Sequence, residues 1–231
     1  MFSEGELELL QKIISQGLLQ ALGETLLMTF VPTILAFAIG LPLGILLVTG
    51  DEKGIHPLPR WLMKLLHFII NILRSVPFLI LLIVVLPLSR ALVGTTVGTR
   101  AILVPLVVAA FPFVARLVET SIREVDPGVV EAAQSMGASP FQIVWKVLIP
   151  EARPALISNF MVALITIFGY GAMSGAVGGG GIGKLALAYG YQRYRYAVLY
   201  LAVIVLVLIT QIIQSFGTWL AAKLDKRLKN K

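Results

Sequence analysis

The sequence contains no cysteine and only two histidines, His56 and His67. Without cysteine, the chain can form neither disulfide bridges nor thiolate metal sites. Two histidines in the first third of the chain are too few for a typical zinc site or catalytic triad. We therefore expect no metal site, no cofactor and no catalytic residue in this chain.

Charged residues are also scarce: they make up only 13% of the 231 residues, whereas hydrophobic residues make up 58%. The mean hydropathy is +0.91, and a soluble domain averages about 25% charged residues. This composition excludes disorder and indicates a membrane protein. At roughly 20 residues per transmembrane helix, the chain has room for five or six spans. The predicted fold is all-α, a polytopic membrane protein with about five transmembrane helices.

Five apolar stretches are candidate spans. They cover residues 25–48, 67–88, 98–116, 155–177 and 197–221. The third is the weakest because Pro105 and Pro112 interrupt it, although prolines are tolerated where neighbouring groups satisfy the freed carbonyls. Residues 1–22 precede the first span, and their apolar side chains recur at helical spacing. They form either a short interfacial helix outside the membrane or an N-terminal extension of the first span.

The distribution of lysine and arginine predicts the orientation in the membrane. Twelve of the 19 lie in 49–66, 116–154 and the tail after residue 221, whereas six lie in the connections on the other side. Because positively charged loops face the cytoplasm, we expect the N-terminus outside and the basic tail 222–231 in the cytoplasm. The connection 116–154 is then a cytoplasmic loop, and it is longer than most connections.

That loop contains two consecutive helix start signals. Asp126 and Pro127 match a helix N-cap followed by proline at the first helical position, and Ser139 and Pro140 repeat the pattern. Gly137 suits the left-handed residue that ends a helix. Two short helices are therefore predicted to meet at a glycine corner.

The second loop helix is expected to end at Pro150 and to have one aromatic and aliphatic face. Phe141, Val144, Trp145 and Leu148 recur at helical spacing on that face. Such a short helix must pack against something, either the ends of its own spans or a cytoplasmic partner anchored by Phe141 and Trp145. A DNA-binding helix-turn-helix would need more cations than this loop has, so we expect no nucleic-acid partner.

The same loop carries a family motif. Its parts are EAA at 131–133, glycine at 137 and VLIP at 147–150. They resemble the EAA signature of permease subunits of ATP-binding-cassette importers, with aliphatic substitutions at Val147 and Ile149. The stretches 74–78, 112–116 and 169–191 are similar to the methionine importers of that family.

The resemblance implies an architecture and a mechanism. Residues 23–221 would form a type 1 permease domain in a bacterial inner membrane, and two copies would enclose a pathway for methionine or a related amino acid. Its partners would be the lipid bilayer, an extracytoplasmic binding protein and two copies of a separate ATPase that holds ATP and Mg²⁺. The helix after Gly137 would be a coupling helix seated in a groove of the ATPase. The resemblance assigns coupling to Glu131, Ala132, Ala133, Gly137, Ala138, Ser139, Pro140, Phe141, Val144 and Trp145.

A glycine-rich run covers residues 178–185. It fits the spacing of a phosphate-binding loop, but Leu185 stands where a serine or threonine would hold magnesium. We therefore expect no nucleotide site here and an ATPase on another chain. The run is either a flexible turn or an outside surface that a substrate-delivering protein approaches. The candidate docking residues are Gly178, Gly180, Gly183 and Lys184.

Four residues within the spans are candidates for the transport pathway. Arg74 lies roughly 10 Å into the second span at 1.5 Å per residue, and intramembrane charges usually face the bundle interior or a water path. The alternative is an arginine that pairs with carbonyls freed by Pro77 or reaches the inner membrane interface. Tyr170, Met173 and Ser174 lie among the glycines of the fourth span, where close helix packing is the alternative to a pathway role.

Rival functions are distinguished by what they require. A permease for another small solute would have the same composition and topology. A membrane enzyme would need converging acid, base or metal ligands, but the carboxylates of the predicted spans lie only at their edges, at Glu24 and Glu119. A channel would not need the coupling loop.

Overall fold

The computed structural model describes residues 11–224, and every regular element in that part of the chain is a helix. This confirms the all-α prediction. The predictions for residues 1–10 and for residues 225–231 of the basic tail lie outside the described residues.

Four helical segments are long and apolar enough to cross a membrane. They are Ile13–Thr49, Thr99–Arg123, Pro140–Val177 and Tyr196–Leu220. A fifth span is obtained if the bent pair Arg60–Ser75 and Phe78–Val93 counts as one. The predicted number of about five spans agrees with this arrangement.

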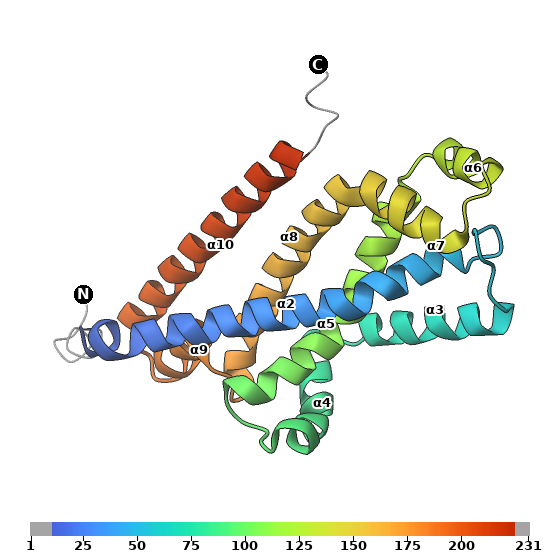
Figure 1. Ribbon diagram of the computed structural model, residues 1–231. Helices are drawn as coiled ribbons and strands as arrows, with labels where there is room; N and C mark the ends of the chain where they lie inside the picture. Colours follow the sequence, from blue (N-terminus) through green and yellow to red (C-terminus); the bar gives the residue numbers. More distant parts are fainter. Residues whose placement is uncertain (1–10, 225–231) are drawn as a thin grey trace. The chain divides into compact units, whose positions relative to one another are not determined.

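The helices follow one another with short connections (Figure 1). They are α2 (Leu18–Thr49), α3 (Arg60–Ser75), α4 (Phe78–Val93), α5 (Thr99–Arg123), α6 (Pro127–Ser135), α7 (Pro140–Ile143), α8 (Ile149–Met173), α9 (Gly181–Lys184) and α10 (Tyr196–Leu224). Wider π-helical turns cover Ile13–Gly17, Val144–Leu148 and Leu185–Tyr191, and a 3-10 turn covers Ser174–Val177.

The chain divides into two compact units. Unit 1 comprises Met1–Ile34, Val76–Ala110 and Leu164–Ser215, and unit 2 comprises Leu35–Ser75, Phe111–Ala163 and Phe216–Lys231. A core cluster of unit 1 joins the buried residues Ala21, Ile182, Ala186 and Ala202. A core cluster of unit 2 joins the buried residues Leu47, Met63, Ile70 and Ala115.

The first helix differs from the predicted boundary between residues 22 and 23. The helix runs unbroken from residue 11 into α2, so the described part of the segment 1–22 extends the first span and forms no separate interfacial helix. The physical reason is burial, because Leu18, Ala21 and Leu22 pack in the core of unit 1.

The second predicted span, 67–88, is not one straight helix. It is broken at Val76 and Pro77 into α3 and α4, and α3 begins at Arg60, earlier than predicted. Pro77 lacks a backbone N–H and disfavours the helical conformation of the residue before it. With φ −55° and ψ 136°, it stands outside α4 as the N-cap residue.

The loop predicted over 116–154 is much shorter in the structure. Helix α5 continues past Pro105 and Pro112 to Arg123, and a continuous helical segment begins again at Pro140 and runs to Val177. The prediction that Pro150 ends a loop helix is therefore wrong. The π-helical turn before Pro150, in which the Ile149 N–H donates to the Val144 carbonyl, changes the hydrogen-bond register where proline offers no donor.

Candidate functional site

The short helix α6 begins and ends at the residues that the sequence predicts. Asp126 is its N-cap, and its carboxylate accepts a hydrogen bond from the Gly128 N–H at 2.7 Å. At the other end Gly137 has φ +79°, a left-handed conformation that favours glycine. The Ala138 N–H then donates to the Ala133 carbonyl at 3.1 Å. Helix α6 is thus fixed at both ends.

A capping box starts the next helix immediately after this corner. The Ser139 hydroxyl accepts from the Gln142 N–H at 3.4 Å, and the Gln142 side-chain oxygen accepts from the Ser139 N–H at 2.9 Å. This reciprocal pair satisfies two backbone donors that a helix start leaves without partners. The turn between α6 and α7 is therefore a defined corner, and we call it, together with the residues that follow it as far as Trp145 (136–145), the α6–α7 corner.

Large apolar side chains are exposed at the α6–α7 corner. Met136 is 81% exposed, Phe141 72% and Trp145 56%, and the Phe141 and Trp145 rings lie 6.1 Å apart. These side chains lie on a short turn, on α7 and on the π-helical turn after it, in a segment with charged residues nearby, and an exposed apolar patch of this kind marks a candidate interaction surface. Among the other predicted coupling residues, Glu131, Ala132, Gly137, Ser139 and Pro140 are exposed, and Ala138 is half-buried.

Other side chains of the same segment are buried and anchor the α6–α7 corner to the rest of unit 2. Ala133, Ile143 and Leu148 are each at most 5% exposed, and Val144 is half-buried. The predicted single face of Phe141, Val144, Trp145 and Leu148 is therefore divided: the two aromatic rings point outward, whereas Leu148 packs inward. The π-helical turn Val144–Leu148 contributes to this division because it changes the angle between successive side chains.

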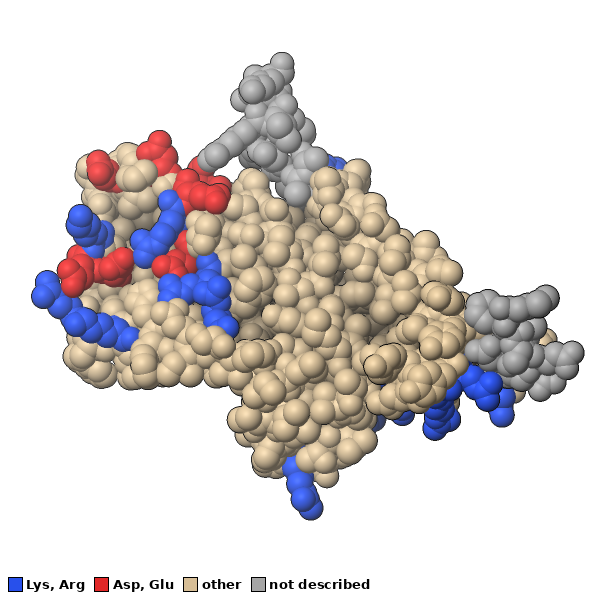
Figure 2. Space-filling model, turned by 180° about the vertical axis from the view of Figure 1, so that it is seen from behind, with Lys and Arg blue, Asp and Glu red and all other residues tan. Residues whose placement is uncertain are grey.

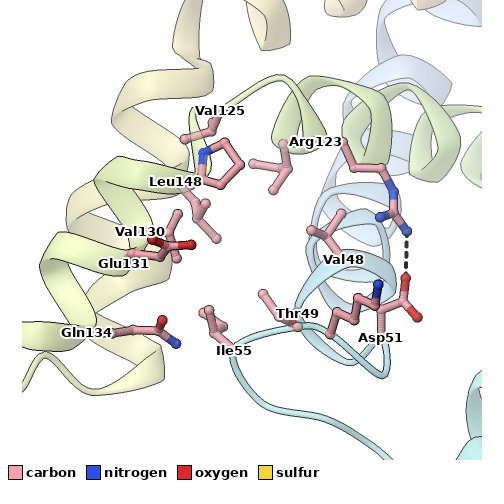
Figure 3. A pocket seen from close by; sticks show the side chains of 14 residues that line it. Val48, Thr49, Asp51, Ile55, Arg123, Val125, Val130, Glu131, Gln134 and Leu148 are labelled. Carbon is pink, nitrogen blue, oxygen red and sulfur yellow. Dashed lines mark hydrogen bonds and ion pairs between the residues drawn. The ribbon is translucent and has the colours of Figure 1, made fainter.

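A cavity of about 490 Å³ lies in unit 2 beneath α6. It is bounded by α6, the end of α5 and the connection after α2 (Figure 3). Glu131 and Gln134 of α6 line one side, and Val48, Thr49 and Asp51 line the other. The cavity combines charged and aliphatic walls, so the inner face of α6 is only partly packed.

Ion pairs fix the connection that borders this cavity. Arg123 pairs with Asp51 at 3.1 Å and with Glu119 at 3.1 Å. Glu119 is buried and also pairs with Arg116 at 2.6 Å. The hydrogen bond from Arg123, together with one from the Glu52 N–H, lowers the pKa of Asp51 below its usual value. Figure 2 shows the acidic side chains of unit 2 gathered together and interleaved with lysine and arginine.

The glycine-rich run, which belongs to unit 1, is packed and is not a flexible turn. The Gly181 N–H donates to the Glu24 carboxylate at 2.7 Å, and the Ile182 N–H donates to the Thr25 hydroxyl at 2.8 Å. Gly180 and Gly183 are buried, and a Cβ atom at Gly183 would collide with the backbone of α8. Of the four candidate docking residues, only Gly178 and Lys184 are exposed.

The four candidate pathway residues have different surroundings. Tyr170 stacks on Phe78 with ring centroids 4.3 Å apart. Ser174 is fully buried and donates its hydroxyl proton to the Gly171 carbonyl at 2.6 Å, which fits the packing alternative. Met173 is exposed in unit 1, and Arg74 is exposed in the last turn of α3 in unit 2.

Comparison with known proteins gives one consistent family. The model of the family described as binding-protein-dependent transport system inner membrane component matches residues 40–230. The chain belongs to this family. It is 46% identical to the "Probable D-methionine transport system permease protein MetI" of Vibrio cholerae over 92% of this chain and 94% of that protein. It is also 46% identical to the D-methionine transport system permease protein MetI of Escherichia coli, over 68% of this chain and 72% of that protein.

Solved structures agree with this assignment. A chain of the MetNI methionine ABC transporter, in an inward-facing conformation, superposes with a TM-score of 0.87 at 41% identity, over 97% of this chain and 100% of that chain. A chain of an amino acid ABC transporter solved with histidines has a TM-score of 0.72 at 20% identity, over 98% of this chain and 100% of that chain. The second likeness shows the fold alone.

Membership in the family confirms three predictions. The chain is a permease subunit of a transport system and not an enzyme, it is a multi-pass component of an inner membrane, and it has the fold of an importer permease. Sequence reasoning missed Met136, Gln142, Glu24 and Thr25 as parts of the site. Only Gln142 had a local signal, because serine followed three residues later by glutamine is the pattern of a capping box.

Proposed function

We propose that this permease forms, as a homodimer, the membrane pathway of an ATP-driven importer of methionine. The support for the substrate is that relatives at 46% identity are described as D-methionine transport permeases and that the solved transporter at 41% identity is a methionine transporter. A separate ATPase, present in two copies, supplies ATP hydrolysis with Mg²⁺, and an extracytoplasmic binding protein delivers the solute. The N-terminus faces outside and the C-terminus faces the cytoplasm, because most cations lie in the connections of one face.

The α6–α7 corner is the surface to which the ATPase docks. The observation that carries this is the contrast between the exposed Met136, Phe141 and Trp145 and the buried Ala133 and Ile143 of the same short segment. Aromatic and methionine side chains on a rigid base are typical of interface centres. Helix α7 is the first turn of the long segment that runs to Val177, whereas α6 is a separate helix. The exposed Met136 directly follows α6. We therefore include the end of α6 in the docking surface, in addition to the helix after Gly137.

The coupling mechanism follows from the stiffness of this corner. When ATP binding brings the two ATPase copies together, each corner moves with its ATPase as a rigid body. The corner is joined without a break to the long helix Pro140–Val177, so its displacement moves the base of that helix. The permease dimer then exchanges an inward-facing state for an outward-facing one.

The test of the proposed function is uptake of labelled methionine by vesicles that contain the complete complex. D-methionine and L-methionine should each be tested alone and against excess unlabelled amino acids. We expect ATP-dependent uptake of methionine that only methionine or a close analogue suppresses. Uptake of a different solute, with no response to either enantiomer of methionine, would refute the substrate assignment.

A further inference from the structure

Helix α3 carries six polar side chains, and five of them recur at alternating intervals of four and three residues. These five are Arg60, Lys64, His67, Asn71 and Arg74. At 3.6 residues per turn, this spacing places all five on one narrow face of the helix. We call this face the polar arc. His67 is half-buried, and the other four side chains are exposed.

Apart from Ser75 at its last position, the rest of the surface of α3 is apolar and divides into two faces. On one face, the buried Met63 and Ile70 pack with Leu47 of α2 and Ala115 of α5. On the other, Phe68 and Ile72 are exposed, as expected for a surface covered by lipid or by a second copy of the chain. The polar arc lies between a protein-facing side and an apolar outer side.

Within unit 2, α3 runs alongside the C-terminal part of α2 (Figure 1). Asn71 also receives a hydrogen bond at 2.9 Å from Arg116 of α5. Because α2 and α5 belong to candidate spans, α3 extends into the membrane beside them. Arg74 lies fourteen residues after Arg60, about 21 Å along the helix axis at 1.5 Å per residue.

Cations at this depth must face water or protein, because a charged side chain is costly in lipid. Arg116 is neutralised by its 2.6 Å ion pair with Glu119. Among the described residues, neither Lys64 nor Arg74 forms an ion pair with a carboxylate. A hydrated space next to the polar arc would satisfy both groups, and it would have a net positive lining.

We infer that the polar arc of α3, together with Arg116, lines a water-filled inner section of the transport pathway, where the cations attract the carboxylate of the passing solute. This inference rests on the proposed function, which supplies the pathway. Four of the five side chains of the polar arc are exposed, so water would screen their attraction for the solute, which favours weak and transient binding. Weak binding is what conduction requires, since a solute held tightly would not leave.

The experiment uses the absence of cysteine from the sequence, so that each introduced thiol is the only one in the permease. Two pairs of neighbouring residues at equal depth serve as test and control: His67→Cys with Phe68→Cys, and Asn71→Cys with Ile72→Cys. The complete permease–ATPase complex in lipid nanodiscs, with any ATPase cysteines replaced, is treated with a sulfonate-bearing methanethiosulfonate. Correct assembly of each variant is checked by gel filtration.

We expect cysteines on the polar arc to react at least about tenfold faster than their neighbours, because desolvation that raises a thiol pKa by one unit removes about nine-tenths of the reactive thiolate. The sulfonate reagent should react faster than an ammonium-bearing one at Asn71→Cys. Trapping the complex with ATP and vanadate should slow both reactions, because the inner side of the pathway closes.

Three results would overturn the inference: equal labelling on both faces, a preference for the ammonium reagent, or rates that follow the anionic lipid content and ignore nucleotide. The last would instead identify α3 as a helix that binds lipid headgroups. Failure of methionine uptake with the face-dependent labelling intact would refute the proposed substrate and leave the pathway in place. Normal methionine uptake without face-dependent labelling would refute the pathway role of the polar arc and leave the proposed substrate in place.

Discussion

Replacing Gly137 with valine tests whether the shape of the α6–α7 corner, and not only its composition, couples the permease to its ATPase. Gly137 has φ +79°, and a Cβ atom placed there meets no atom within 4 Å. The penalty is therefore purely conformational, roughly 1–2 kcal/mol for an L-residue in a left-handed conformation, and more for a β-branched one. This shifts the equilibrium about fivefold to thirtyfold against the native corner.

The assay is the affinity of the purified permease for its ATPase, measured together with ATP-driven uptake. The apparent affinity of the permease for the ATPase should fall in proportion to the fraction of permease molecules that keep the native corner, that is, by up to about fivefold to thirtyfold. The helical content of the permease should stay unchanged. Gly137→Asn should be milder, because asparagine tolerates the left-handed region. The matched control is Gly94→Val, since Gly94 has φ +82° and an equally open Cβ position but lies in unit 1. If Gly137→Val binds and transports like the unchanged permease, corner geometry does not control coupling.

Three further predictions concern other parts of the molecule. Phe141→Ala should weaken ATPase binding by about 2 kcal/mol, as for an interface anchor, and unchanged binding in a titration would exclude that role. The hydrogen bond from Arg123 lowers the pKa of Asp51, so its stabilisation is present above the usual pKa of 3.8 and is lost as pH falls through the lowered value. Asp51→Asn should flatten this dependence in thermal unfolding at acidic pH, although only slightly because the pair is half exposed. Gly183→Ala should destabilise the permease by about 1–3 kcal/mol through overpacking, whereas Gly169→Ala, with open space at Cβ, should not; equal melting temperatures for the two variants would contradict this.

Local signals predicted the helix ends of the coupling region well. Asp126 caps α6, Gly137 takes the left-handed conformation, and Ser139 caps α7. Each of these features depends on a hydrogen bond or a dihedral angle within a few residues of its own position. Sequence patterns can therefore report them without knowledge of the fold.

Prolines show where such local reasoning ends. Pro77 breaks the second span, whereas Pro105, Pro112 and Pro150 lie within continuous helical segments. The outcome depends on whether the groups freed by each proline find other partners, as in the π-helical turn before Pro150. That is a property of the surroundings, so the sequence does not decide it.

Long-range pairs were also beyond the sequence. Glu24 looks like a carboxylate at the edge of a span, but it binds the Gly181 N–H, a residue 157 positions away in the chain. Thr25 binds Ile182 in the same way. Reading the glycine-rich run by itself suggested a flexible turn, because nothing in the run indicates that its donors are matched on another helix.

The side chains of unit 2 connect the two regions to which we assign coupling and conduction. Asp51 lines the cavity beneath α6 and pairs with Arg123, which pairs with Glu119. Glu119 pairs in turn with Arg116, and Arg116 binds Asn71 of the polar arc. Because the buried Glu119 binds both arginines through its two carboxylate oxygens, a displacement of one guanidinium shifts the carboxylate that the other one binds, and losing both would leave a buried charge unpaired, which is costly. A displacement of the connection at Asp51 therefore reaches Asn71 through a short series of ion pairs and hydrogen bonds, without requiring α3 itself to be pushed.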